Sequence, residues 1–167
     1  MIGSELKVGV MTWFSYENYG TALQAVALQE VLRSMDCTPS LINYRPRSTR
    51  SRNEPAGFSD LIGKAAGKTK RLFIGGSAAY SSPERSELFS SFISDHCLLT
   101  EPANSFPELK QVAHGLDCCI CGSDQVWSPN CFDENYFLPF VEDSQRRISY
   151  APSFGASSIT DPEIERR

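Results

Sequence analysis

The chain has 167 residues, of which 41% are hydrophobic, and its formal net charge is −4. This length suits one domain, and this composition is that of an ordinary globular protein. There is no basic excess that would indicate a nucleic-acid partner, and no run of about 18 apolar residues that would predict a transmembrane segment. Residues 1–7 lack the pattern of a signal peptide, so we expect a cytoplasmic protein, with the inner face of the membrane as an alternative location.

The chain begins with a predicted strand, helix and strand. Residues 6–13 form an apolar strand, and residues 21–35 have helical spacing. The apolar side chains of this helix form two adjacent stripes, which are Leu23, Ala27 and Val31, and Leu28, Leu32 and Met35. So broad an apolar face is typical of a helix packed on a sheet, and a second strand is predicted at residues 41–44, after Pro39. This order predicts a parallel βαβ unit with a right-handed crossover.

The middle of the chain begins with a basic stretch. Residues 45–57 contain four Arg and two Pro. We interpret them as a solvated loop or, alternatively, as a patch that meets a phosphate-bearing ligand or an anionic surface. Three helices are then predicted at residues 58–74, at residues 83–96 with Ser82 as N-cap and Pro83 in the first turn, and at residues 105–113 with Ser105 as N-cap.

The last part of the chain contains two predicted strands. Residues 116–120 are a short apolar run that leads into a polar loop at residues 121–130. Residues 136–140 hold a Pro and are predicted as an edge strand or extended piece. The last strand is predicted at residues 147–151.

The end of the sequence has the signature of a helix start. Asp161 suits an N-cap, and Pro162 suits the first helical position. A helix that begins here has too few residues to bury a face. We therefore expect residues 1–167 to be a truncated domain.

The six cysteines could form a metal or redox site, but their spacing favours another interpretation. Side chains alternate across a strand, so Cys118 should point away from Cys119 and Cys121. No C-x-x-C pair or other standard zinc spacing is present in the sequence. We expect buried, reduced thiols and no bound metal, and we interpret His96 and His114 as structural.

Three polar, glycine-bearing loops follow three of the predicted strands. The first contains Gly20 and Thr21 at a helix N-terminus, where free N–H groups can hold an anion, although it matches no dinucleotide or Walker motif. The second contains Asp124, the best-placed carboxylate for acid–base work, and the third contains Ser153. Ligands of open α/β sheets bind outside the carboxyl ends of the strands, so we expect one shared site. The alternatives are that Asn18 or Thr21 only caps the helix and that Asp124 only caps a turn.

Five sequence blocks, taken together, carry a resemblance to a known family. They are residues 18–25 (NYGTALQA), 42–46 (INYRP), 122–129 (GSDQVWSP), 136–138 (YFL) and 148–155 (ISYAPSFG). In order and spacing they resemble the N-terminal half of the polysaccharide pyruvyl transferase family, and the resemblance runs from Lys7 to the end of the chain. The departures are Pro152, where Ala is expected, and Cys118, Cys119 and Cys121, where bulky apolar residues are common.

The resemblance implies a fold and an activity. The fold is α/β, with a Rossmann-like parallel sheet and flanking helices, as in the N-terminal domain of a GT-B-type two-domain transferase. The activity is transfer of pyruvate from phosphoenolpyruvate to sugar hydroxyls, forming a ketal, in surface polysaccharide biosynthesis. The partners are a sugar or glycan acceptor and the donor phosphoenolpyruvate, without a further cofactor. The C-terminal domain, which contributes basic residues for the donor, is expected to be absent from this chain, so the chain alone should be inactive.

The resemblance also assigns candidate site residues. Asp124 is the candidate catalytic residue, which would orient or deprotonate an acceptor hydroxyl. The candidate substrate-binding residues are Asn18, Tyr19, Gly20, Thr21, Ser123, Gln125 and Ser153, and Trp127 should support the second loop from beneath. Two other functions stay open: a catalytically silent module that at most binds a sugar, and a metal or redox protein that uses its cysteines.

Overall fold

The centre of the molecule is a parallel sheet. The structure is a computed structural model that describes residues 5–15, 17–45, 82–159 and 161–166. Within these residues, four strands pair in the order β2-β1-β3-β4, and each neighbouring pair is parallel. The strands are β1 (Leu6–Met11), β2 (Cys37–Leu41), β3 (Cys118–Cys121) and β4 (Arg146–Ser149). The prediction of an α/β fold with a parallel sheet is confirmed.

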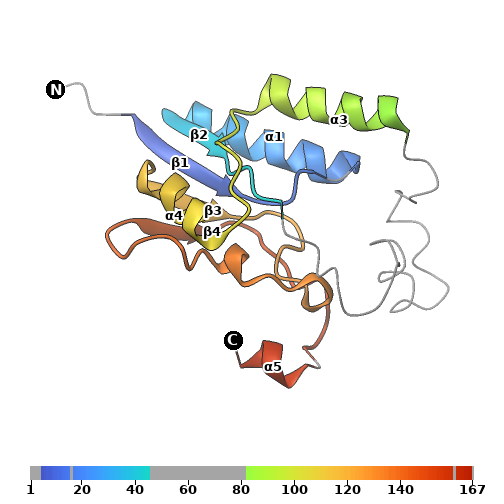
Figure 1. The fold of residues 1–167 in the computed structure, drawn as a ribbon, viewed down its shortest axis with the longest axis vertical. Helices are drawn as coiled ribbons and strands as arrows, with labels where there is room; N and C mark the ends of the chain where they lie inside the picture. The colour runs from blue at the N-terminus through green and yellow to red at the C-terminus, as the bar shows by residue number, and fades with distance from the viewer. Residues whose placement is uncertain (1–4, 16, 46–81, 160, 167) are drawn as a thin grey trace.

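Helices cover both faces of this sheet (Figure 1). The helices are α1 (Tyr19–Ser34), α3 (Pro83–His96), α4 (Phe106–His114) and the short α5 (Pro162–Glu165), with 3-10 turns η3 (Pro129–Cys131) and η4 (Glu134–Phe137). Helices α1 and α3 lie on one face, and α4 lies on the other with η4. None of the helices in the described part of the chain is long and apolar enough to cross a membrane.

Local capping explains where the helices begin. The Asn18 side chain accepts a hydrogen bond from the Thr21 N–H at 3.2 Å and starts α1. Ser82 does the same for the Arg85 N–H at 3.2 Å, and Pro83 suits the first turn of α3. Ser105 precedes α4 as predicted, although its side chain makes no capping hydrogen bond. The predicted helix at residues 58–74 and the basic stretch after Arg45 lie outside the described residues.

The predicted position of the second strand is wrong, because β2 includes Pro39 and ends at Leu41. The Ile42 N–H donates to the Val10 oxygen of β1, whereas the Leu41 N–H points the other way and donates to the Leu98 oxygen. The alternation of a strand therefore directs the Pro39 nitrogen away from β1. A proline there costs no hydrogen bond to the neighbouring strand.

The predicted inner face of α1 is wrong in part. Leu23 and Val31 are 57% and 53% exposed, Ala27 is exposed too, and Met35 of the other predicted stripe is 65% exposed. The buried side chains are Thr21, Ala22, Ala25, Leu28, Gln29 and Leu32. The sheet covers only one side of the helix, and the small alanines allow the helix to approach it closely. Sequence periodicity cannot choose between two adjacent apolar stripes.

The core lies on both sides of the sheet, and β3 contributes to each. Cys118 and Ile120 pack with α1 and α3, and Cys119 and Cys121 pack with α4. The predicted opposite orientation of Cys118 is therefore confirmed. All six cysteines are free thiols, and burial raises the pKa of Cys119 and of Cys121 to about 12.

Two expectations for the last third of the chain need correction. Residues 136–140 were expected to be extended, but the 3-10 turn η4 covers Tyr136 and Phe137, and Leu138 has a left-handed backbone with φ of 60°. The last strand, β4, begins and ends earlier than predicted, and all of its side chains are exposed. The predicted helix start at Pro162 is confirmed as α5.

Candidate functional site

The loops that follow β1, β3 and β4 meet at the carboxyl edge of the sheet. The Thr12 hydroxyl, after β1, donates to the Ser123 oxygen at 2.8 Å. The backbone of Asp124, after β3, pairs with that of Pro152, after β4. The Ser153 backbone N–H donates to the Asp124 backbone carbonyl oxygen at 2.9 Å. The structure therefore brings together the three loops that the sequence singled out.

The Asp124 carboxylate is held in one orientation. Its Oδ2 accepts a hydrogen bond from the Thr21 hydroxyl at 3.2 Å, and its Oδ1 accepts one from the Gln125 N–H at 2.7 Å. A carboxylate accepts about four hydrogen bonds, so these two leave acceptor capacity on a side chain that is half-buried. The backbone φ of Asp124 is +90°, a value that non-glycine residues seldom adopt and that is concentrated at functional sites.

Gln24 is a site residue that the sequence reasoning missed. Its amide Nε2 donates to the Thr12 hydroxyl and to the Trp13 oxygen, both at 3.1 Å. Its Oε1 accepts a hydrogen bond from the Ser123 hydroxyl at 2.8 Å. One side chain of α1 thus ties the end of β1 to the loop after β3. The sequence offered only a Gln near the start of the helix, and its direction toward the strand ends depends on the packing of α1 on the sheet.

Ser123 is oriented inward by these contacts. Its carbonyl oxygen and its hydroxyl both bond to neighbouring segments. The peptide between Gly122 and Ser123 is cis, and Gly122 has φ of +112°. Ser123 thus positions the loop that presents Asp124.

The four candidate residues at the start of α1 have different roles in the structure. Asn18 is the helix cap, as the alternative interpretation held, and Thr21 contacts Asp124. Gly20 is exposed. The Tyr19 ring packs instead against α3: its centroid lies 5.1 Å from that of Phe89 and 5.4 Å from the Arg85 guanidinium carbon.

Gln125 and Ser153 form the exposed rim of the site. The Gln125 side chain lies against Gly155, which has φ of +62°. The Ser153 hydroxyl accepts a hydrogen bond from the Gly155 N–H at 2.9 Å, and its carbonyl accepts one from the Trp127 N–H at 3.3 Å. Both side chains are exposed, so a ligand at Asp124 can reach them.

Trp127 joins the site to a group of aromatic rings. It is half-buried against the core, and its Nε1–H donates to the Tyr136 oxygen at 3.2 Å. Its ring stacks on Phe137, with centroids 5.0 Å apart and planes at 6°, and lies 5.7 Å from the Phe154 ring. Trp127 therefore supports the loop, as expected, while part of the ring stays accessible.

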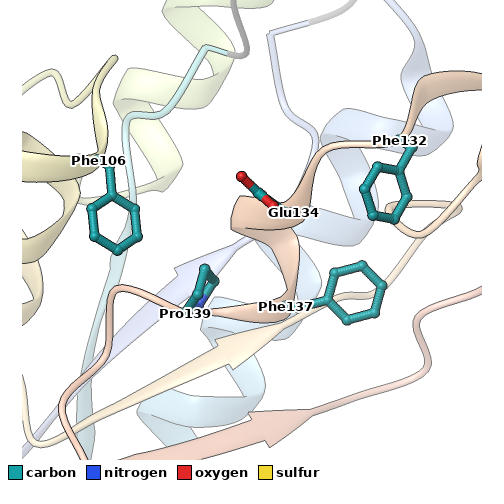
Figure 2. A pocket seen from close by; sticks show the side chains of 5 residues that line it. All are labelled: Phe106, Phe132, Glu134, Phe137 and Pro139. Carbon is teal, nitrogen blue, oxygen red and sulfur yellow. The ribbon is translucent and has the colours of Figure 1, made fainter. Parts of the chain in front are cut away.

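Beyond Trp127 lies a groove of about 500 Å³ that the sequence did not predict. It is lined by Phe106, Phe132, Glu134, Phe137 and Pro139, and we call it the aromatic groove. Figure 2 shows Phe106 on one side and Phe132 and Phe137 on the other, with Glu134 and Pro139 between them. The lining comes from the start of α4 and from the η4 region, which are far apart in sequence.

A partly buried polar network holds one wall of the aromatic groove. The Tyr44 hydroxyl donates to the Asp133 carboxylate at 2.5 Å and accepts from the Asn135 amide at 2.9 Å. Burial, followed by the Asp133 carboxylate, raises the pKa of Tyr44 above its ordinary value. The network ties η4 to the segment after β2.

The described residues offer no cluster of potential metal ligands. Among the residues with a described placement, no group of three or more His, Cys, Asp or Glu side chains could hold a metal ion. The expectation that the chain binds no metal stays a prediction.

Two comparisons of the sequence with known proteins found no match. The sequence matches no model of a known protein family. A search of the curated proteins finds no match either.

Proposed function

We propose that this chain is the N-terminal domain of a polysaccharide pyruvyl transferase-like enzyme. The reaction would transfer pyruvate from phosphoenolpyruvate to sugar hydroxyls during the synthesis of a surface polysaccharide in the cytoplasm or at the inner membrane face. The observation that carries the proposal is the Asp124 carboxylate, held by Thr21 where three loops of a parallel sheet meet. The five sequence blocks that resemble this family include all three loops.

The chemistry requires a group that handles protons of the acceptor. A ketal forms when the methylene carbon of the enol phosphate takes up a proton and becomes the methyl group. Two sugar hydroxyls then add to the former enol carbon and lose their protons, and phosphate departs. In this proposal Asp124 orients one hydroxyl and accepts its proton. In support, its carboxylate is held by hydrogen bonds and remains partly exposed.

The charge of the site favours the acceptor over the donor. The Asp124 carboxylate lies beside the first turn of α1, where a free helix N-terminus would otherwise suit an anion. A second anion next to this carboxylate would be repelled. The exposed Gln125 and Ser153 offer amide and hydroxyl groups, which suit sugar hydroxyls. In this proposal, the phosphate of the donor is bound by basic residues of a second domain.

The test is Asp124→Asn in an enzyme that contains both domains. If the carboxylate accepts a proton, the rate of transfer should fall by about 100- to 10,000-fold. Asn caps a turn almost as well as Asp, so the fold should be retained. Release of phosphate and the new ketal methyl signal in the proton NMR spectrum measure the reaction.

The matched control is Asp143→Asn. Asp143 is a fully exposed carboxylate whose ion pair, at 2.6 Å, is with Arg147 of β4 and not with a residue of the three loops. It should leave the rate unchanged. An Asp124→Asn enzyme with unaltered kinetics would contradict the catalytic role, and transfer by the 167-residue chain alone would contradict the need for a second domain.

A further inference from the structure

The aromatic rings form a continuous row that leads away from the Asp124 loop. Phe154, next to Ser153, lies 5.7 Å from Trp127 between ring centroids. Trp127 lies 5.0 Å from Phe137, and Phe137 lies 5.9 Å from Phe132. The row thus connects the candidate site to the aromatic groove through contacts that the structure shows at each step.

Three rings of this row and groove are exposed at the surface. Phe106, Phe137 and Phe154 are 45%, 42% and 39% exposed. Clustered apolar rings at a surface mark a place where a ligand or partner binds. The groove has about 500 Å³, within the range of about 300–1,000 Å³ that small-molecule sites occupy.

Hydrogen bonds hold one wall of the groove in place. The Tyr44–Asp133–Asn135 network fixes η4, which carries Glu134 and Phe137. Trp127 is fixed from the other side by its hydrogen bond to the Tyr136 oxygen. These contacts hold the side of the groove that carries Phe137, and a wall that is ordered before a ligand binds lowers the entropic cost of binding.

We propose that the aromatic groove binds a second sugar residue of a glycan acceptor whose first sugar lies at Asp124. This inference rests on the proposed function, and it adds the place on this domain where the sugar next to the modified one would bind. A pyranose has an apolar C–H face that packs on an aromatic ring and an edge of hydroxyl groups that donate hydrogen bonds.

The composition of the groove fits this ligand better than a purely apolar one. The phenyl rings would take the C–H face, and the exposed Glu134 carboxylate would accept from the hydroxyl edge. Glu134 makes another interaction in the structure, and a carboxylate accepts about four hydrogen bonds in total. An alkyl chain laid in the groove would remove water from that carboxylate without replacing its hydrogen bonds, which is unfavourable.

The test is an NMR titration of the ¹⁵N-labelled chain. The ligands are di- to tetrasaccharides of β-linked glucose, galactose and N-acetylglucosamine, each compared with its monosaccharide. The indole N–H of Trp127 reports on the groove, and the indole of Trp13, which is buried in the core, is the internal reference. The amide signals of Gly122 and Gly155 report on the Asp124 site.

The expected result is that at least one oligosaccharide shifts both sets of signals, whereas its monosaccharide shifts only the glycine amides. Phe106→Ala and Phe132→Ala should each lower the affinity for the oligosaccharide by about 2- to 12-fold, which is the contribution of one aromatic contact. The affinity for the monosaccharide should stay unchanged. Glu134→Gln, which preserves the shape of the side chain, should also lower the affinity for the oligosaccharide. Leu88→Ala is the matched control, because Leu88 is 71% exposed on α3, on the other face of the sheet.

The outcomes separate the two proposals. If oligosaccharides shift the glycine amides but not the Trp127 indole, the groove is not a sugar site and the proposed function stands. If they shift the Trp127 indole alone, and do so less in the Phe variants, the groove binds sugars and the role of the Asp124 site is in doubt. If no oligosaccharide shifts the Trp127 indole, or if the Phe variants bind as the wild type does, the inference is overturned.

Discussion

The substitution Gly122→Ala should destabilise the fold through the loop that presents Asp124. Gly122 has φ of +112°, where a side chain is strained. A Cβ there would overlap the Tyr150 carbonyl oxygen and lie 3.1 Å from the Tyr150 carbonyl carbon and 3.2 Å from the Pro152 nitrogen. These are backbone atoms, so no side-chain rotation relieves the contact. Either the segment after β4 moves or Gly122 changes its backbone conformation.

The expected loss follows from these two effects. An unfavourable backbone conformation costs about 1–3 kcal/mol, and forcing extra volume into packed structure costs about another 1–3 kcal/mol. The total of about 2–6 kcal/mol is a large part of the free energy of unfolding of an ordinary domain, about 5–15 kcal/mol. With a dependence on urea of about 2 kcal/mol per molar, the unfolding midpoint should fall by roughly 1–3 M.

Urea unfolding followed by far-ultraviolet circular dichroism measures the shift, and Gly155→Ala is the matched control. Gly155 also has a positive φ, +62°, but the three atoms nearest to an added Cβ belong to the flexible Gln125 side chain. The control should lose about 1–2 kcal/mol, the cost of the left-handed conformation. If Gly122→Ala unfolds at the same urea concentration as Gly155→Ala, the backbone contact is not the constraint described and the reasoning is refuted.

Two further predictions concern buried titratable groups. Tyr44→Phe should lower the free energy of unfolding by about 1–3 kcal/mol, because it removes the hydroxyl that donates to Asp133; exposed Tyr150→Phe is the control. Because the pKa of Tyr44 is raised in the folded state, the contribution of its hydroxyl to the free energy of unfolding is present below about pH 10 and is lost as the pH rises further. Wild type and variant should therefore converge in urea unfolding above about pH 10. Burial raises the pKa of Cys119 and Cys121 to about 12, so both thiols should resist a disulfide reagent at pH 8 until the protein unfolds. Mass spectrometry of labelled peptides measures this, and rapid native labelling of either thiol, or one zinc per chain, would contradict the structural role of these cysteines.

The site could be predicted from the sequence to the extent that it depends on strand ends. In a parallel sheet all carboxyl ends lie at one edge, so Thr21, Asp124 and Ser153 had to approach one another once the strands were recognised. Their hydrogen-bond partners could not be predicted in the same way. The role of Gln24 depends on the rotation of α1 about its axis, which the sheet decides.

Local chemistry alone determined the start of α3, because a Ser cap acts on a backbone group three residues away. The Asn18 cap of α1 is equally local, but α1 begins at Tyr19, two residues before the predicted start. Only the tertiary structure decided which stripe of α1 is buried, since Leu23 and Leu28 are equally apolar and only one stripe meets the sheet. It alone placed β2 through Pro39, because a proline is tolerated only where its nitrogen faces away from the neighbouring strand. The aromatic groove could not be predicted from the sequence, because Phe106 and Phe137 belong to segments that meet only when α4 and η4 cover one face of the sheet.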